Sequence, residues 1–303
     1  MHLTMYAYFS DLLKRYGARE AVRMARACGF SSVELLEIIG PGTPPLFENE
    51  GQAHELRSLL EENELHCACY SVGIFLPADD LGPSCDQSAV DILCRCADYA
   101  HALGSPYLHH TLLPGRVSDE EPRVVLDRFL PELISRAGTV ADYARARGLM
   151  TLYEPQGYYV NAPDGFARFY ERMKRRGHLV GVCGDVGNPW YADSDPVDFF
   201  ARYAGEMRHV HVKDVFLAER EEDCLIRASR PWARTAGGRF VTEAPLGQGR
   251  VDIDACMAHL HRVGYRGAYA LETWYEDDGT ITLQDYLARD CERMLRWRAD
   301  GCE

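Results

Sequence analysis

The 303-residue chain lacks any apolar run that approaches the roughly 20 residues a membrane span needs. Residues 1–6 also lack the basic segment, apolar stretch and small-residue cleavage site that mark a secretory signal. These two absences predict a cytoplasmic protein with no membrane partner.

Basic residues are scarce, because 33 Lys and Arg stand against 46 Asp and Glu and give a net charge of −13. Such an acidic surface repels the phosphate backbone of nucleic acids, so we expect no nucleic-acid partner. Hydrophobic residues make up 47% and charged residues 26% of the chain, a balance that excludes a largely disordered protein.

Cysteine pairs with the two-residue spacing of zinc motifs are missing as well. The 11 cysteines are an odd number, and the closest pairs, Cys67/Cys69 and Cys94/Cys96, are separated by one residue. A chain of this length can build a core without disulfides. We therefore predict free, buried thiols.

Short β-branched or aromatic runs alternate with longer amphipathic stretches along the whole chain. The predicted strands are 3–8, 32–38, 66–74, 107–112, 150–154, 179–185, 208–213 and 267–273. The predicted helices are 12–28, 52–62, 87–103, 119–147 (one long helix or a helix broken at Pro131), 164–175, 196–204, 252–263 and 283–298. Eight strand–helix units in one chain of this length predict a single-domain (β/α)₈ TIM barrel.

A doubly wound parallel sheet is the competing α/β architecture. Such a sheet usually carries a glycine-rich phosphate loop after its first strand, where this chain has Tyr8-Phe9-Ser10-Asp11. No linker or composition shift divides the chain, which favours one domain. The stretch at about 215–249 is predicted to be an irregular inserted loop.

Four consecutive predicted strands end in residues that can bind metals. These are Glu154, Asp185, the pair His209 and His211, and Glu272. Active sites of such barrels lie at the carboxyl ends of the strands, so these side chains are expected to meet there. Three carboxylates and one imidazole suit Mn²⁺, Mg²⁺ or Co²⁺ better than a thiolate-rich structural site would.

The segments around these residues resemble the xylose-isomerase-like TIM barrel superfamily of sugar and sugar-phosphate isomerases and epimerases, which is also described as endonuclease family 2-like. The motifs are Tyr153-Glu154-Pro155, Gly184-Asp185-Val186-Gly187-Asn188-Pro189, His209-Val210-His211-Val212-Lys213-Asp214, Pro245-Leu246-Gly247-Gln248-Gly249 and Leu271-Glu272. The resemblance implies one divalent ion, Mn²⁺ first and Mg²⁺, Co²⁺ or Zn²⁺ as alternatives. The implied ligands are Glu154, Asp185, His211 and Glu272.

The resemblance further implies a metal-dependent sugar or sugar-phosphate isomerase or epimerase that works through an enediolate. Glu154 and Glu272 are the expected catalytic residues, one removing a proton beside the substrate carbonyl and the other returning one. Two alternatives stay open: a keto-inositol-type dehydratase of the same superfamily, and a non-catalytic carbohydrate-binding barrel. The expected partner is a small sugar or polyol, and a homo-oligomer is also open.

The residues predicted to contact this substrate are His110, Asn188, Lys213 and Trp190. His110 belongs to the pair His109-His110, of which one is expected to face the site, and Trp190 with Trp274 would offer an apolar wall. An amide such as that of Asn188 binds hydroxyl groups well but is a poor metal ligand.

The same Asn188 stands where the DNA-repair branch of the superfamily expects a metal ligand, which argues against that branch. Either Glu34 or Glu37 is expected to point into the barrel mouth. The inserted loop carries Arg220, Arg227, Arg230, Arg234 and Arg239, which suit either a lid over a phosphate or carboxylate group or a solvated surface loop.

Overall fold

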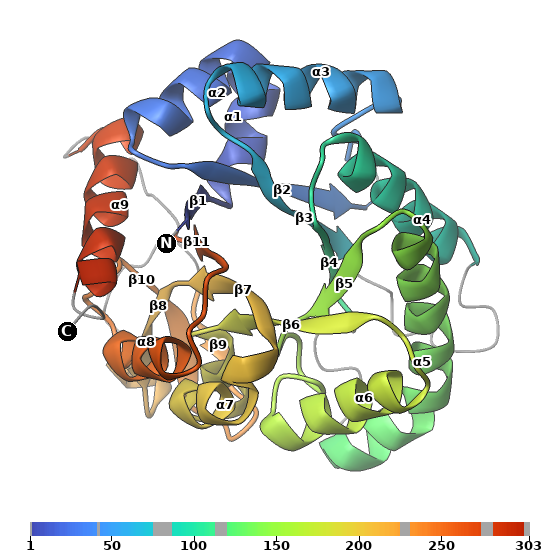
Figure 1. Ribbon diagram of the computed structural model, residues 1–303. Coiled ribbons are helices and arrows are strands. Elements are labelled where there is room, and N and C mark those ends of the chain that lie inside the picture. Colours follow the sequence, from blue (N-terminus) through green and yellow to red (C-terminus); the bar gives the residue numbers. More distant parts are fainter. Residues whose placement is uncertain are drawn as a thin grey trace.

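Eight parallel strands close into a barrel, which confirms the predicted (β/α)₈ fold (Figure 1). In spatial order they are β1 (His2–Met5), β11 (Ala268–Leu271), β7 (Met207–Val212), β6 (Val180–Asp185), β5 (Met150–Tyr153), β4 (Tyr107–His110), β3 (Cys67–Ile74) and β2 (Ser32–Ile39). The computed structural model describes residues 2–40, 43–74, 87–112, 120–224, 231–273 and 281–299.

An outer ring of helices surrounds the strands (Figure 1). It consists of α1 (Tyr8–Tyr16), α2 (Ala18–Ala27), α3 (Glu50–Glu62), α4 (Gln87–Ala102), α5 (Pro122–Ala146), α6 (Pro163–Arg175), α7 (Pro196–Tyr203), α8 (Ile253–Arg262) and α9 (Leu283–Ala299). Several helices begin at a side chain that accepts a first-turn amide hydrogen, as Asn49, Asp195 and Asp252 do for α3, α7 and α8. Their apolar faces pack on the outside of the barrel and form the main core.

Two regions of predicted helix, at 12–28 and at 119–147, contain a residue at which the helix could be interrupted. The single helix expected at 12–28 is wrong, because Gly17, at φ +80°, ends α1 and begins α2. In the other case, Pro131 does not break α5 but lies inside it on the exposed face. Leu130, Leu133 and Ile134 stay buried on either side of Pro131, so packing offsets the hydrogen bond that proline cannot make.

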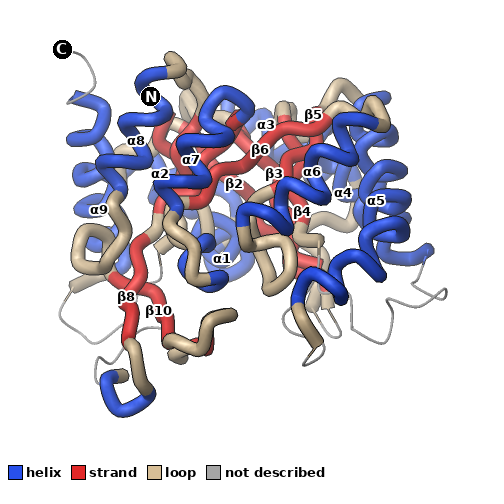
Figure 2. The backbone as a smooth tube through the Cα atoms, turned by 90° about the horizontal axis from the view of Figure 1, so that it is seen from below, coloured by secondary structure: helices blue, strands red, loops and turns tan. Residues whose placement is uncertain are grey.

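The stretch expected to be irregular after the seventh barrel strand is ordered into a second, antiparallel sheet. Its strands pair in the order β8 (Asp214–Ala218), β10 (Phe240–Ala244) and β9 (Ala233–Arg234). Figure 2 shows β8 and β10 extending beyond the end of the barrel. Composition alone suggested a loop because the pairing joins segments that lie more than twenty residues apart in the chain.

Cys69 of β3, Leu152 of β5 and Cys183 of β6 form a small buried apolar cluster separate from the main core. The nine cysteines described by the structure are all free thiols, as predicted, but Cys94 and Cys224 are only partly buried. Within the described ranges, no helix has both the length and the apolar character needed to cross a bilayer.

Candidate metal centre and active site

Four of the predicted site residues meet at the carboxyl ends of neighbouring strands. Glu154 directly follows β5, Asp185 ends β6, His211 lies near the end of β7, and Glu272 directly follows β11. The register places Asp185 and Ala270 on opposite sides of His211. Because a strand alternates its side chains between two faces, this register turns the ligand-type residues toward the barrel axis.

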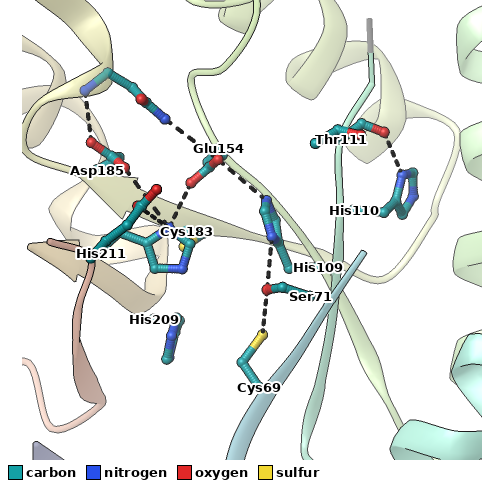
Figure 3. A network of polar contacts seen from close by, with 12 residues as sticks. Cys69, Ser71, His109, His110, Thr111, Glu154, Cys183, Asp185, His209 and His211 are labelled. Atoms are coloured by element: carbon teal, nitrogen blue, oxygen red, sulfur yellow. Dashed lines mark hydrogen bonds and ion pairs between the residues drawn. The ribbon is translucent and has the colours of Figure 1, made fainter. Parts of the chain in front are cut away.

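The three carboxylates of this set surround the Nδ1 nitrogen of His211. His211 Nδ1 lies 2.9 Å from Glu154 Oε2, 3.4 Å from Glu272 Oε2 and 3.8 Å from Asp185 Oδ2. Figure 3 shows Glu154, Asp185 and His211 converging on this point. Ligand atoms bound to one cation at about 2.0–2.3 Å lie about 3–4 Å from one another. Asp185, His211 and Glu272 offer ligand atoms within 4.8 Å of one another, as Glu154 and His211 do together with Cys183, so the cluster is a candidate metal site.

The hydrogen-bonding state of the same four atoms supports that reading. Glu154 Oε2, Asp185 Oδ2, His211 Nδ1 and Glu272 Oε2 are all buried, and none makes a hydrogen bond within the described part of the chain. Buried polar atoms normally have hydrogen-bond partners, and those that lack them are found at ion-binding and other functional sites. Oxygen-rich donors with a single imidazole fit a divalent cation.

Asp185 is held so that only one of its oxygens faces the centre. Its Oδ1 accepts hydrogen bonds from the backbone amides of Gly187 at 2.8 Å and Asn188 at 2.7 Å. A Cβ atom on Gly187 would lie 2.6 Å from Lys213 Cγ, so this tight turn needs glycine. Burial raises the pKa of Asp185, and nearby Glu272 raises it further, while Lys213 opposes both.

Lys213 places a cation against the acidic cluster. Its Nζ lies 3.1 Å from Asp185 Oδ2 and 3.0 Å from Glu272 Oε1, and the side chain is 5% exposed. Burial alone would lower the pKa of Lys213, but Asp185, Glu272 and Glu154 raise it well above its ordinary value. The ammonium group therefore stays charged at the edge of the acidic cluster.

Glu34 belongs to the site although it was not among the residues predicted to bind metal or substrate. Its carboxylate lies 2.6 Å from His209 Nε2 and 3.2 Å from His211 Nε2, and Ser71 Oγ donates to it. Burial alone would raise the pKa of Glu34, but the two histidines lower it well below its usual range. In the sequence, this role was indicated only by the two glutamates within an otherwise apolar strand, Glu34 and Glu37. In the structure it is Glu34 that contacts the histidines of the site.

Of the pair on β4, the structure turns His109 rather than His110 toward the centre. His109 Nε2 lies 3.7 Å from Glu154 Oε1, and its Nδ1 lies 3.0 Å from Ser71 Oγ. His110 instead contacts the Tyr153 ring, with its Nδ1 3.0 Å from the carbonyl oxygen of Thr111 (Figure 3). Burial lowers the pKa of His110 to about 4. Successive residues of a strand point to opposite faces, so only one of the two could face inward.

Of the remaining predicted substrate contacts, Asn188 and Lys213 line the cavity over the site, whereas Trp190 is not among the described residues that line it. Asn188 Nδ2 donates to Glu154 Oε1 at 3.4 Å. Trp190 is half-buried, with the guanidinium of Arg239 5.6 Å from its ring centre, and the next residue, Tyr191, lines the cavity over the site. Trp274 lies outside the described residues.

A cavity of about 770 Å³ opens over the metal centre. Lys213, Asn188 and Glu272 line the end at the acidic cluster, and Arg234 with residues 235–238 of the inserted sheet lines it as well. A second cavity of about 240 Å³ also reaches Glu272 and is lined by His109. The volume of the larger cavity is in the usual range for small-molecule sites.

Comparison with known proteins identifies the family to which this chain belongs. The model of the xylose isomerase-like TIM barrel family matches residues 22–297, and the chain belongs to that family. It is also similar to the inosose dehydratase of Geobacillus kaustophilus (strain HTA426), with 27% identity over 185 residues that cover 58% of this chain. The matched part spans 58% of the length of that dehydratase.

Solved structures with the same fold include metal-bound and sugar-bound proteins. A xylose isomerase-like TIM barrel protein from Mycobacterium smegmatis in complex with magnesium is 15% identical, with a TM-score of 0.68, and the match covers 100% of this chain and 98% of that one. The D-allulose 3-epimerase from Methylomonas sp. in complex with D-allulose is 16% identical, with a TM-score of 0.69, over 98% and 97% of the two chains. At these identities the likeness concerns the fold.

Proposed function

We propose that this chain is a divalent-metal-dependent sugar or polyol isomerase or epimerase that transfers a proton beside the substrate carbonyl. One observation carries the proposal: Glu154 and Glu272 leave different strands, yet the Oε2 atoms of both lie within 3.4 Å of His211 Nδ1. Two carboxylates that approach one point from separate strands can reach different sides of a bound carbon atom. One can accept a proton and the other can return one.

The proposed ligands of the ion are Glu154, Asp185, His211 and Glu272. A divalent ion held by them would supply Lewis acidity toward a substrate carbonyl and the neighbouring hydroxyl group. Lys213 Nζ, charged and beside Glu272, is placed to donate to a substrate oxygen. Asn188, already bonded to Glu154, is placed to bind a substrate hydroxyl group through its amide.

Dehydration of a keto-inositol is a second candidate, favoured by the similarity to an inosose dehydratase. Both reactions begin with proton removal beside a carbonyl, and they diverge only when a hydroxyl group is expelled. Mass analysis of the products separates them, because only dehydration loses water. If the chain were a non-catalytic carbohydrate-binding barrel, neither the isomerised nor the dehydrated product would form.

The test is metal-dependent exchange of substrate hydrogen with deuterium from the solvent, measured across a panel of ketoses, keto-inositols and their phosphates. The wild-type protein should exchange at least one member of the panel. Glu154→Gln and Glu272→Gln should each lower exchange or turnover by about 10²–10⁴-fold at saturating metal, the usual contribution of a positioned base.

Glu132→Gln is the matched control, because that glutamate pairs with Arg136 on the outer surface of α5. Its exchange rate should equal that of the wild-type protein. Full rescue of both site variants by added metal would remove the proton-transfer role from the two glutamates and leave them as ligands alone.

A further inference from the structure

The inserted sheet brings a cation to the cavity over the metal centre. Arg234 ends β9, pairs with Phe240 of β10, and is followed by the turn at residues 235–239. Arg234, which is exposed, and residues 235–238 line the same cavity as Lys213 and Glu272. Arg234 and Glu272 of the acidic cluster therefore belong to the wall of one cavity.

The turn is fastened to the barrel by hydrogen bonds, although Ala236 and Gly237 are exposed. Asp193, directly after the short helix η2 (Asn188–Ala192), accepts hydrogen bonds from Thr235 Oγ1 at 2.9 Å, from Arg239 Nε at 2.7 Å and from the amide of Gly237. The amide of Ala236 also donates to the carbonyl oxygen of Tyr191 at 3.0 Å. Because η2 follows the proposed ligand Asp185, these bonds fix Arg234 relative to the centre.

Two of the cations near this turn already have partners. Arg239 is paired with Asp193 and Glu219, and Lys213 is paired with Asp185 and Glu272. Arg234 has no ion pair or hydrogen bond within the part of the chain that the structure describes, although the protein carries a net charge of −13.

The backbone of the turn offers no alternative anion site. The amides of Thr235, Ala236, Gly237 and Gly238 all donate to the protein itself, to Arg239, Tyr191, Asp193 and Thr235 respectively. The hydroxyl group of Thr235 is likewise used, since it donates to Asp193. An anion in this part of the cavity would therefore be bound by the guanidinium.

We propose that Arg234 binds an anionic group of the substrate, a carboxylate or a phosphate, so that the substrate class is an acidic keto-sugar or a keto-sugar phosphate. The inference rests on the proposed function, because it assumes that the substrate fills this cavity. A guanidinium binds either group through two parallel hydrogen bonds, which neutral sugars cannot match. In so acidic a protein, a free arginine in the cavity wall also offsets the repulsion that an anionic substrate meets.

The experiment measures equilibrium binding by calorimetry to the Mg²⁺-loaded full-length protein. The probes are matched sets: D-fructose and D-tagatose, their 6-phosphates, and the corresponding ketouronates. The wild-type protein should bind at least one anionic member about tenfold or more tightly than its neutral parent, and the member preferred distinguishes phosphate from carboxylate. Arg234→Gln should remove that preference, and Arg234→Lys should retain part of it.

Arg220→Gln is the control, because Arg220 lies in the same insertion but is exposed and paired with Glu222 and Asp223. It should keep the wild-type preference. No tighter binding of any anionic member, or an unchanged preference in Arg234→Gln, would overturn the role of Arg234.

These outcomes are separable from those of the proposed function, since binding requires no turnover. Deuterium exchange without any anion preference would overturn the role of Arg234 and keep the proposed reaction. An anion preference that depends on Arg234, without exchange on any substrate, would keep the anion site and overturn the reaction.

Discussion

At the scale of single residues, Glu34 orients His211 within the proposed metal centre. Its carboxylate lies against His211 Nε2, where it would hold the proton of a neutral imidazole and leave the Nδ1 lone pair for a metal ion. Tyr6 stacks on the other side of the same imidazole, with the ring centres 4.5 Å apart. The orientation of His211 is therefore set by groups that do not themselves bind the ion.

We predict that Glu34→Gln lowers the affinity for Mn²⁺ about 10–100-fold, the usual effect of removing such an orienting carboxylate. The amide keeps the size of the side chain but brings an N–H group toward one of the two histidines. Calorimetric titration of the metal-free protein measures the change.

Glu37→Gln is the matched control for this prediction. Glu37 is buried on the same strand, but it accepts from Tyr70 and from the amide of Leu46 and does not contact either histidine. Equal loss of affinity in both variants would indicate a general effect of removing a buried carboxylate from β2.

At the scale of secondary-structure elements, the carboxyl end of β7 continues into the inserted sheet and connects the metal centre to the cavity wall. His211 and Lys213 face the centre, and the next residue, Asp214, begins β8. The Asp214 carboxylate accepts from the amides of Gly247, Gly249 and Val251, which closes the end of the insertion against its start. The insertion is thus anchored at its base by Asp214 and at its turn by Asp193.

We predict that Asp193→Ala releases the turn at residues 235–239. Hydrogen bonds to a charged group contribute about 1.5–3 kcal/mol each, so amide hydrogen exchange in this turn should accelerate about tenfold or more. Binding of substrate should weaken, while the affinity for Mn²⁺ should stay unchanged because Asp193 does not contact the metal centre.

Asp223→Ala serves as the control, because Asp223 lies in the same insertion and pairs with Arg220 at the surface. In Asp223→Ala, amide hydrogen exchange in the turn at residues 235–239 should equal that of the wild-type protein. Wild-type exchange in Asp193→Ala would show that pairing of β9 with β10 holds the turn by itself.

At the scale of the whole molecule, the barrel concentrates negative charge at one end of an already acidic chain. Glu154, Asp185 and Glu272 lie around His211 with one lysine as the counter-ion. Like charges brought together in a buried place destabilise the folded state unless a cation joins them. The stability of the whole fold should therefore depend on the bound ion.

We predict that Mn²⁺ or Mg²⁺ at a hundredfold excess over its Kd stabilises the protein by about 2.7 kcal/mol, which raises Tm by about 4 °C for a chain of this length. Thermal unfolding with and without a chelator measures this shift. Asp185→Asn should abolish most of it, whereas Asp142→Asn, on the surface beside His178, should not. A Tm unaffected by millimolar divalent ions would contradict the assignment of the cluster as a metal centre.

Much of the fold follows from the sequence because its signals are local. The alternation of short β-rich and longer amphipathic segments predicts the eight barrel strands, and each predicted strand overlaps an observed one. The strand ends then bring Glu154, Asp185, His211 and Glu272 to one end of the barrel, since parallel strands share their carboxyl edge.

Other features of the site were decided only by the tertiary structure. They depend on which face of a strand each side chain occupies and on pairing between segments that lie far apart in the chain. Either His109 or His110, and either Glu34 or Glu37, could have faced inward until strand register fixed which face each occupies. Likewise, the inserted sheet forms through pairs such as Asp214 with Ala244, which no local pattern reveals. Local sequence determines where strands begin and end, whereas long-range packing determines which side chains meet at the proposed metal centre. Packing also brings Arg234, which has no ion pair within the described part of the chain, to the wall of the cavity beside it.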